Sequence, residues 1–184
     1  MNNLTIRPET PSDHAAITRL NDFAFGRSAE GRLIENLRKL AEFDSRLSLV
    51  AELEGEIAGH VLLFPIRHTP IASGPSFLES DEKPVRILSL GPISVLPAYQ
   101  KQGIGGQLIE AGHRAAHELG YSAVVLLGHA SYYPRFGYAP AQKWGLTNQW
   151  KITGEAWMAI ELIEGALDGM TGEMIYPEAF NEAT

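Results

Sequence analysis

The stretch SVLPAYQKQGIGGQ, residues 94–107, runs from apolar residues through Pro97 into a glycine cluster and then into a helical pattern. Glycines between a strand and a helix let the backbone approach a ligand closely. The free amides at a helix N-terminus favour an anion as that ligand. The stretch therefore predicts an anion-binding turn, and the rest of the chain must indicate which anion it binds.

Two common nucleotide-binding loops do not fit this turn. A dinucleotide fingerprint needs a third glycine where the chain has Leu108, and a nucleoside-triphosphate loop needs Gly-Lys-Ser/Thr, which does not follow Gly105 or Gly106. What remains is Gln-x-x-Gly-x-Gly, matched by Gln100, Gly103 and Gly105. So short a pattern is also typical of a tight connecting turn, and that alternative stays open on the pattern alone.

Composition narrows the class of protein. The 184 residues are 45% hydrophobic, which is enough for the core of one domain. Asp and Glu total 22 against 15 Lys and Arg, with no concentrated basic run, which disfavours nucleic-acid binding. The absence of cysteine excludes disulfides, cysteine-ligated zinc and a thiol nucleophile. The chain begins without a signal-peptide core and its apolar runs are too short to span a bilayer, so we expect a cytoplasmic protein.

Periodicity and punctuation predict an α/β chain in the order βαα-ββ-βα-β with a β-rich tail. The expected helices are a first one from Ser12-Asp13 to Gly26 and two more over 29–40 and 103–119. The expected strands are 4–7, 47–53, 57–66, 86–95, 123–127, 157–163 and 174–176, with a helical turn at 131–136. Residues 68–84 are expected to form a surface loop and a candidate lid.

Two further stretches agree with the glycine turn and reveal a family resemblance. Residues 88–100, LSLGPISVLPAYQ, and residues 131–138, SYYPRFGY, lie at the expected distances on either side of it. Together they resemble the GCN5-related N-acetyltransferases, the GNAT superfamily. The likeness is greatest to the YhbS-like predicted acetyltransferases, through residues 24–27 with Glu30, 165–167 and 175–180. It covers nearly the whole chain.

The resemblance implies a single GNAT domain with a core of about 4–145 and a β-rich C-terminal extension of about 146–184. It implies an α/β (α+β) fold with a central mixed, mostly antiparallel twisted sheet, flanked by helices and splayed between its fourth and fifth strands. It also implies acetyl-CoA as cosubstrate and no metal. Residues 101–106 would hold the pyrophosphate through backbone amides and the helix dipole, with Lys101 assisting.

The pantetheine arm of CoA would pair with the backbone at Ile93 and Val95 as an added strand does. The side chains at these two positions are as readily explained as core. The full set of residues expected at the cofactor is Ile93, Ser94, Val95, Gln100, Lys101, Gln102, Gly103, Ile104, Gly105 and Gly106.

The activity implied is direct transfer of an acetyl group to an amine, with a backbone amide near Ile93 stabilising the oxyanion. Tyr133 matches the family's general acid toward the departing thiolate, and the alternative is a packed aromatic with a satisfied hydroxyl. Glu30 is the first candidate for the base, and the alternative is a glutamate that only favours the helix dipole. His68 and His113 receive no role.

One stretch departs from the subgroup. Gly-Asp-Pro usually precedes the double tyrosine, whereas this chain has Gly128-His129-Ala130, which puts any role of that aspartate in doubt. The departure favours an alternative function, a catalytically weak acyl-CoA-binding sensor or partner-binding module. The expected partners are acetyl-CoA and an amine of a small molecule or a protein, without nucleic acid or membrane. The acceptor and a homodimer are left open.

Overall fold

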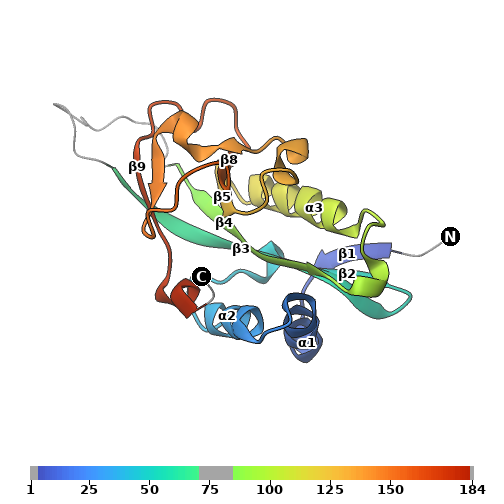
Figure 1. The fold of residues 1–184 in the computed structure, drawn as a ribbon. Coiled ribbons are helices and arrows are strands. Elements are labelled where there is room, and N and C mark those ends of the chain that lie inside the picture. The colour runs from blue at the N-terminus through green and yellow to red at the C-terminus, as the bar shows by residue number, and fades with distance from the viewer. Residues whose placement is uncertain (1–3, 71–84, 183–184) are drawn as a thin grey trace.

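A computed structural model describes residues 4–70 and 85–182 (Figure 1). Its strands form a sheet in the order β1-β2-β3-β4-β5-β8-β6, and β9 joins β3 to β7 beside this path. The helices are α1 (His14–Phe25), α2 (Ala29–Leu37) and α3 (Ile104–Glu118). The strands are β1 (Leu4–Pro8), β2 (Ser48–Leu53), β3 (Glu56–Pro70), β4 (Ile87–Val95), β5 (Ala123–Leu127), β6 (Ala139–Pro140), β7 (Leu146–Asn148), β8 (Trp157–Glu161) and β9 (Gly172–Ile175).

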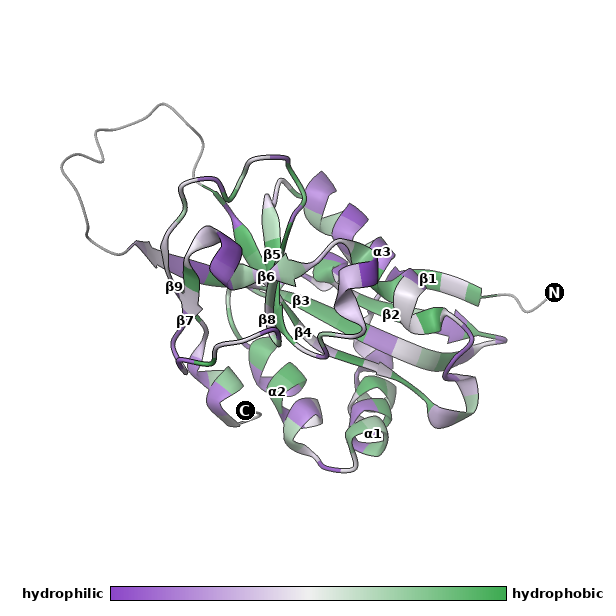
Figure 2. Ribbon diagram, turned by 45° about the horizontal axis from the view of Figure 1, so that its top comes forward, coloured by the Kyte–Doolittle hydropathy of each residue, from purple (hydrophilic) through white to green (hydrophobic). Residues whose placement is uncertain are grey.

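Helices cover both faces of the sheet, α1 and α2 on one side and α3 on the other (Figure 1). Successive side chains of a strand point to opposite faces, so β3 supplies a core on each side. Leu62 and Phe64 join the core under α1 and α2, and Val61 and Leu63 join the core under α3. Figure 2 shows the apolar positions gathered along these strands and on the helix sides that meet them.

The predicted helix stops are confirmed, and some boundaries differ. Gly26 follows α1 with φ 67°, and Gly120 follows α3 with φ 77°, the left-handed conformation that ends helices. Helix α2 ends at Leu37 instead of residue 40. The loop predicted over 68–84 was wrong at its start, because β3 continues to Pro70 by pairing with β9. The rest of that loop, the candidate lid, lies outside the described residues.

The sheet separates between β4 and β5, as the fold prediction required. The two strands are parallel and pair only where Ile87–Ser89 lies beside Ala123–Val125. Beyond Ser89, β4 continues to Val95 with β3 on its other edge. A bulge interrupts that pairing at Gly91 and Pro92, because Leu63 pairs with Leu90 and Val61 with Ile93. Proline has no amide hydrogen for the ladder, so a bulge suits it.

A buried hydrogen-bonded network ties the helices α1 and α2 to the sheet. Arg38, at the end of α2, donates to both carboxylate oxygens of Glu9 at 2.7 and 2.9 Å. Ser48 Oγ donates to Glu9 Oε2 at 2.5 Å and lies 2.9 Å from His60 Nε2. Asn21 Nδ2 of α1 lies 3.5 Å from His60 Nδ1. Burial lowers the pKa of His60, which favours a neutral ring that donates to Ser48 and accepts from Asn21.

The same network fixes the charge of Glu9. Burial by itself raises the pKa of this carboxyl, but His60 Nε2, 3.7 Å away, and the hydrogen bonds from Arg38 and Ser48 outweigh it and lower the pKa to about 2. A carboxyl with a depressed pKa stabilises the fold above its unfolded pKa, and that stabilisation is lost as pH falls toward the folded value. For Glu9 this window runs from 4.5 down to about 2.

We expect Glu9→Gln to lower the free energy of unfolding near pH 7 by about 3 kcal/mol, because Arg38 is left without its buried counterion. Urea unfolding of both proteins measures this difference, which should shrink as pH falls through the window. Glu52→Gln is the control, because Glu52 pairs with Arg7 at a more exposed site. A Glu9 effect that is the same at about pH 7 and about pH 3 would contradict the assignment.

Candidate functional site

A cavity of about 1170 Å³ opens where β4 and β5 separate. Its lining comes from β4, from the glycine turn, from the segment after β5, from α2 and from the C-terminal region. Every site residue predicted from the sequence lines it except Gln102, whose side chain donates instead to the Ala98 carbonyl at 3.1 Å. The structure thus brings Glu30 and Tyr133 into one cavity with the glycine turn.

The glycine turn has the backbone that its sequence predicts. Lys101 has φ 61° and Gly103, the N-cap of α3, has φ 85°. Left-handed residues beside extended ones turn successive amides toward one concavity, which suits an anion. A Cβ on Gly103 would meet no atom within 4 Å among the described residues, so this glycine is required for its conformation and not for space.

The other two glycines allow the segment after β5 to approach α3. A Cβ on Gly105 would lie 3.2 Å from the Tyr132 hydroxyl, and one on Gly106 would lie 3.4 Å from the Phe136 ring. Gln100 ties the start of the turn to the end of β4, because its side-chain amide donates to the Val95 carbonyl at 3.1 Å.

Tyr133 lies buried among aromatic rings. Its ring centroid is 5.2 Å from that of Tyr132 and 5.7 Å from that of Tyr138. A side chain on Gly128 would collide with the Tyr133 ring, so glycine is needed there. Burial raises the pKa of Tyr133 to about 12, which keeps the phenol protonated at neutral pH. Within residues 4–70 and 85–182 its hydroxyl makes no hydrogen bond, and Tyr133 lines the cavity.

The turn before the double tyrosine forms without the subgroup's aspartate. The carbonyl of His129 accepts from the Tyr132 amide at 2.9 Å and from the Tyr133 amide at 3.4 Å. These bonds use only the backbone of His129, and its side chain lines the cavity. Replacement of Asp-Pro by His129-Ala130 is therefore compatible with the turn that carries Tyr133.

Glu30 lies in the first turn of α2 and is only 5% exposed. Arg27 holds its carboxylate through two nitrogens, Nε at 3.0 Å and Nη2 at 2.5 Å from Oε1. The residue thus lies both at a helix N-terminus, where a negative charge is favourable, and at the cavity wall. Neither interpretation of Glu30 is removed by its position.

Charged side chains divide the cavity into two ends. Lys101 lies in the glycine turn, and Arg135 stacks 4.6 Å over the ring of Tyr132, which contacts the same turn. Glu30 lies on the opposite side, with α2. The first end fits an anion, whereas the Glu30 carboxylate at the second end is already paired with Arg27.

Sequence reasoning missed the contribution of the C-terminal region. Trp150, Tyr176 and Phe180 line the cavity, although the β-rich tail received no role from the sequence. The aromatic residues of 175–180 were the available signal. Two polar atoms in the lining, Ser94 Oγ and the Tyr176 hydroxyl, are buried without a hydrogen-bond partner in the described part of the chain.

The two histidines without a predicted role lie elsewhere. His113 Nε2 is 2.9 Å from the Tyr138 hydroxyl, and burial lowers the pKa of this ring to about 4. His68 Nε2 donates to the Thr171 carbonyl at 3.1 Å. Across residues 4–70 and 85–182, no three His, Cys, Asp or Glu side chains gather into a metal-binding group. The same ranges contain no helix with the length and apolarity needed to cross a membrane.

Comparison with known proteins identifies the family of this chain. The model of the acetyltransferase (GNAT) family matches residues 14–138. The uncharacterized N-acetyltransferase YhbS of Escherichia coli K12 is 32% identical over 179 residues, which cover 97% of this chain and 99% of YhbS.

Solved structures agree with this result over nearly the whole chain. The crystal structure of E. coli YhbS in complex with CoA has a TM-score of 0.85 at 31% identity, covering 98% of this chain and 93% of that one. The structure of a GNAT family acetyltransferase from Brucella melitensis with acetyl-CoA has a TM-score of 0.74 at 30% identity, covering 98% and 99%. The chain therefore belongs to the GNAT family of acetyltransferases.

Proposed function

We propose that this protein is an acetyl-CoA-dependent N-acetyltransferase that transfers the acetyl group directly to a primary amine. One observation carries the proposal: a single cavity extends from the glycine turn, through the gap between β4 and β5, to Glu30. Donor and acceptor can therefore meet inside one site. The crystal structures of related proteins from E. coli and B. melitensis, which contain CoA and acetyl-CoA, support the choice of donor.

The residues present fit a CoA molecule. The concavity at 101–106 would receive the pyrophosphate, with Lys101 and Arg135 adding positive charge. Beyond Ser89, the edge of β4 that faces the gap has no β5 residue paired to it in the described chain, so its backbone can pair with the pantetheine amides. The unpartnered Ser94 Oγ offers a further polar contact at this edge.

In the reaction that we propose, the uncharged amine nitrogen attacks the thioester carbonyl. A C–N bond forms, the C–S bond breaks, and the amine loses one proton while the thiolate gains one. A backbone amide near Ile93, beside the bulge, stabilises the oxyanion. Tyr133 gives its proton to the thiolate, and Glu30 takes the proton of the amine directly or through water. No acyl-enzyme is involved, in agreement with a chain that has no cysteine.

The same cavity supports our domain assignment. The glycine turn and the C-terminal aromatic residues line it together, so we propose that the core and the β-rich extension work as one domain. The acyl-CoA-binding sensor remains the competing function. Isothermal titration with acetyl-CoA followed by a thiol-release assay over amines of several classes distinguishes the two, because a sensor binds the donor and releases no thiol.

We expect Gly103→Val to weaken CoA binding about 10-fold or more, because valine cannot hold φ 85° and the turn loses the conformation that directs its amides. Isothermal titration with CoA measures the effect. Gly55→Val is the matched control, because Gly55 also has a positive φ, 87°, and open space around its Cβ, but belongs to the β2–β3 hairpin. Equal CoA affinity in the two variants would remove the turn from the binding site.

We expect Tyr133→Phe to lower kcat about 100-fold with unchanged CoA affinity, because the leaving thiolate loses its proton donor. Steady-state kinetics and CoA titration separate the two effects. Tyr138→Phe is the control: it removes a neighbouring buried hydroxyl that bonds to His113 and leaves the proton donor in place. Because the pKa of Tyr133 is raised to about 12, its proton should stay available through pH 10. Full turnover by Tyr133→Phe would make Tyr133 a packing residue.

A further inference from the structure

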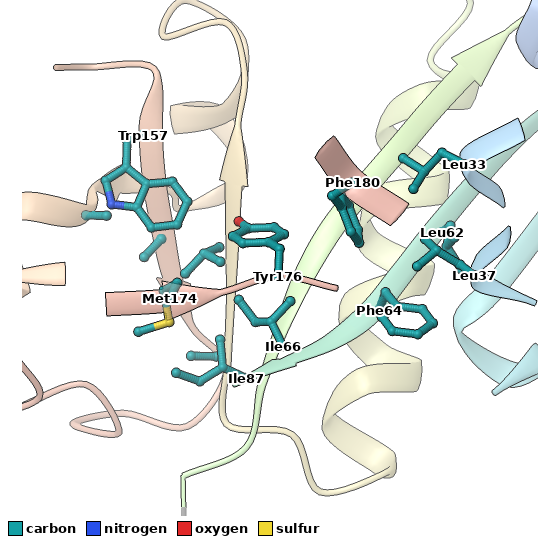
Figure 3. Close-up of a cluster of buried hydrophobic side chains, with 14 of the residues drawn as sticks. Leu33, Leu37, Leu62, Phe64, Ile66, Ile87, Trp157, Met174, Tyr176 and Phe180 are labelled. Carbon is teal, nitrogen blue, oxygen red and sulfur yellow. The ribbon is translucent and has the colours of Figure 1, made fainter. Parts of the chain in front are cut away.

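The end of the cavity away from the glycine turn is aromatic. Trp150, Tyr176 and Phe180 come from the C-terminal region and line this end, which we call the aromatic end. Figure 3 shows the rings of Tyr176 and Phe180 side by side, with Leu33 of α2 beyond Phe180. Glu30 lies one helical turn before Leu33, so its carboxylate belongs to the same end.

Trp150, Tyr176 and Phe180 form the wall of the aromatic end, and hydrogen bonds and ring contacts hold this wall in place. The ring of Tyr176 is 4.6 Å from that of Trp150 and 5.1 Å from that of Phe180, measured between centroids. The indole of Trp150 donates to Asn181 Oδ1 at 3.0 Å, and the Tyr176 amide donates to Gln149 Oε1 at 2.8 Å. The wall is therefore built before a ligand arrives, which reduces the entropy lost on binding.

The wall faces the bulge of β4. A Cβ on Gly91 would lie 4.0 Å from Phe180 Cε1 and 3.2 Å from the Leu62 carbonyl, so the phenyl ring lies beside the bulge. The same bulge leads to Ile93, where the proposed function places the thioester carbonyl. A molecule packed against Phe180 would thus lie next to the reacting atoms.

Few polar groups are available at the aromatic end. Glu30 is its one charged side chain among the described lining residues, since Lys101 and Arg135 belong to the other end. The buried Tyr176 hydroxyl has no partner at full hydrogen-bonding distance in the described chain, but Ser89 lies close enough to lower its pKa as a hydrogen-bond partner does. Buried polar groups of native proteins normally have partners, so this hydroxyl can bond to Ser89 or to a polar atom of a ligand.

We propose that the aromatic end is the acceptor subsite and that it selects a primary amine carried by a compact apolar or aromatic body. This proposal rests on the proposed function. The Glu30 carboxylate is paired with Arg27 but has further lone pairs that can accept from one amine nitrogen. The aromatic faces attract an ammonium group, and the rings favour an apolar body. A polyamine or an aminoglycoside would bury several charges against one carboxylate that Arg27 already pairs.

The first test is a selectivity profile of the full chain with acetyl-CoA, read as thiol release. The panel contains phenethylamine and isoamylamine as apolar amines, with spermidine, an aminoglycoside and a lysine-containing peptide as the alternatives. We expect kcat/KM for the apolar amines to exceed the others by about 10-fold or more. A preference for spermidine, the aminoglycoside or the peptide overturns the subsite proposal while the acetyltransferase function stands.

Variants of the wall connect this selectivity to its residues. Phe180→Leu should raise KM for phenethylamine about 10-fold, because an aromatic contact is lost, and should leave KM for acetyl-CoA unchanged. Phe43→Leu is the matched control, because Phe43 packs against the same core but does not line the cavity. Tyr176→Phe should lower kcat/KM for the preferred amine by removing only the hydroxyl. Equal KM values in the Phe180 and Phe43 variants would contradict the assignment.

Glu30 has a control on its own helix. Glu30→Gln should raise KM for the amine, whereas Glu35→Gln, at an exposed position that bonds Thr18, should leave it unchanged. Calorimetric titration of the CoA-saturated protein with phenethylamine measures the subsite without turnover. We expect heat of binding that Phe180→Leu reduces, and its absence in the unaltered protein overturns the proposal. If the protein binds CoA but releases no thiol with any class of amine, the proposed function is refuted instead.

Discussion

The separation of two parallel strands after three paired residues is the constraint on which the rest of this structure depends. Strand β4 keeps β3 along one edge, and beyond Ser89 its other edge faces the cavity. Exposed strand edges in proteins are normally covered or blunted, because they attract any available backbone. Here the open edge of β4 forms part of the site. The glycine turn, the tyrosines after β5 and the C-terminal aromatic residues line the same cavity.

Helix α2 reaches this opening because buried ionic hydrogen bonds hold it to the sheet. Arg38, at the end of α2, donates to the carboxylate of Glu9. Ser48 Oγ bonds both to this carboxylate and to His60 of β3. Breaking one member of such a network leaves a buried charge unpaired, so its geometry is strongly enforced. The pairing of Arg38 with Glu9 therefore helps to position Glu30, in the first turn of the same helix, although neither residue lines the cavity.

The sequence predicted the parts of the site that are local in the chain. The glycine turn, the end of β4 and Tyr133 each have a short pattern with a physical meaning, and the family resemblance joined them. The mixed, mostly antiparallel sheet and the gap between β4 and β5 followed from that resemblance and are confirmed. Residue roles at the cofactor and in catalysis stay predictions, including that of Gln102, which lies outside the cavity lining.

What the sequence did not predict depends on distant contacts. The extension of β3 to Pro70 requires β9 as a partner, and no local pattern in residues 68–70 announces that pairing. Tyr176 and Phe180 read as part of a tail until the fold places them beside α2 and β4 (Figure 3). The sequence does not show which surface an aromatic residue will contact, so the meeting of Trp150, Tyr176 and Phe180 at one cavity is visible only in the folded structure.

The pairing of β3 with β9 also has a consequence for the folding of the chain. His68 and Thr171, joined by a hydrogen bond at this seam, are 103 residues apart, whereas the glycine turn meets Tyr132 across a short stretch of chain. Contacts with long sequence separation require the closure of large loops, which costs more entropy than the closure of short ones. The aromatic end, whose Tyr176 follows β9, therefore depends on a costlier loop closure than the concavity at the glycine turn does.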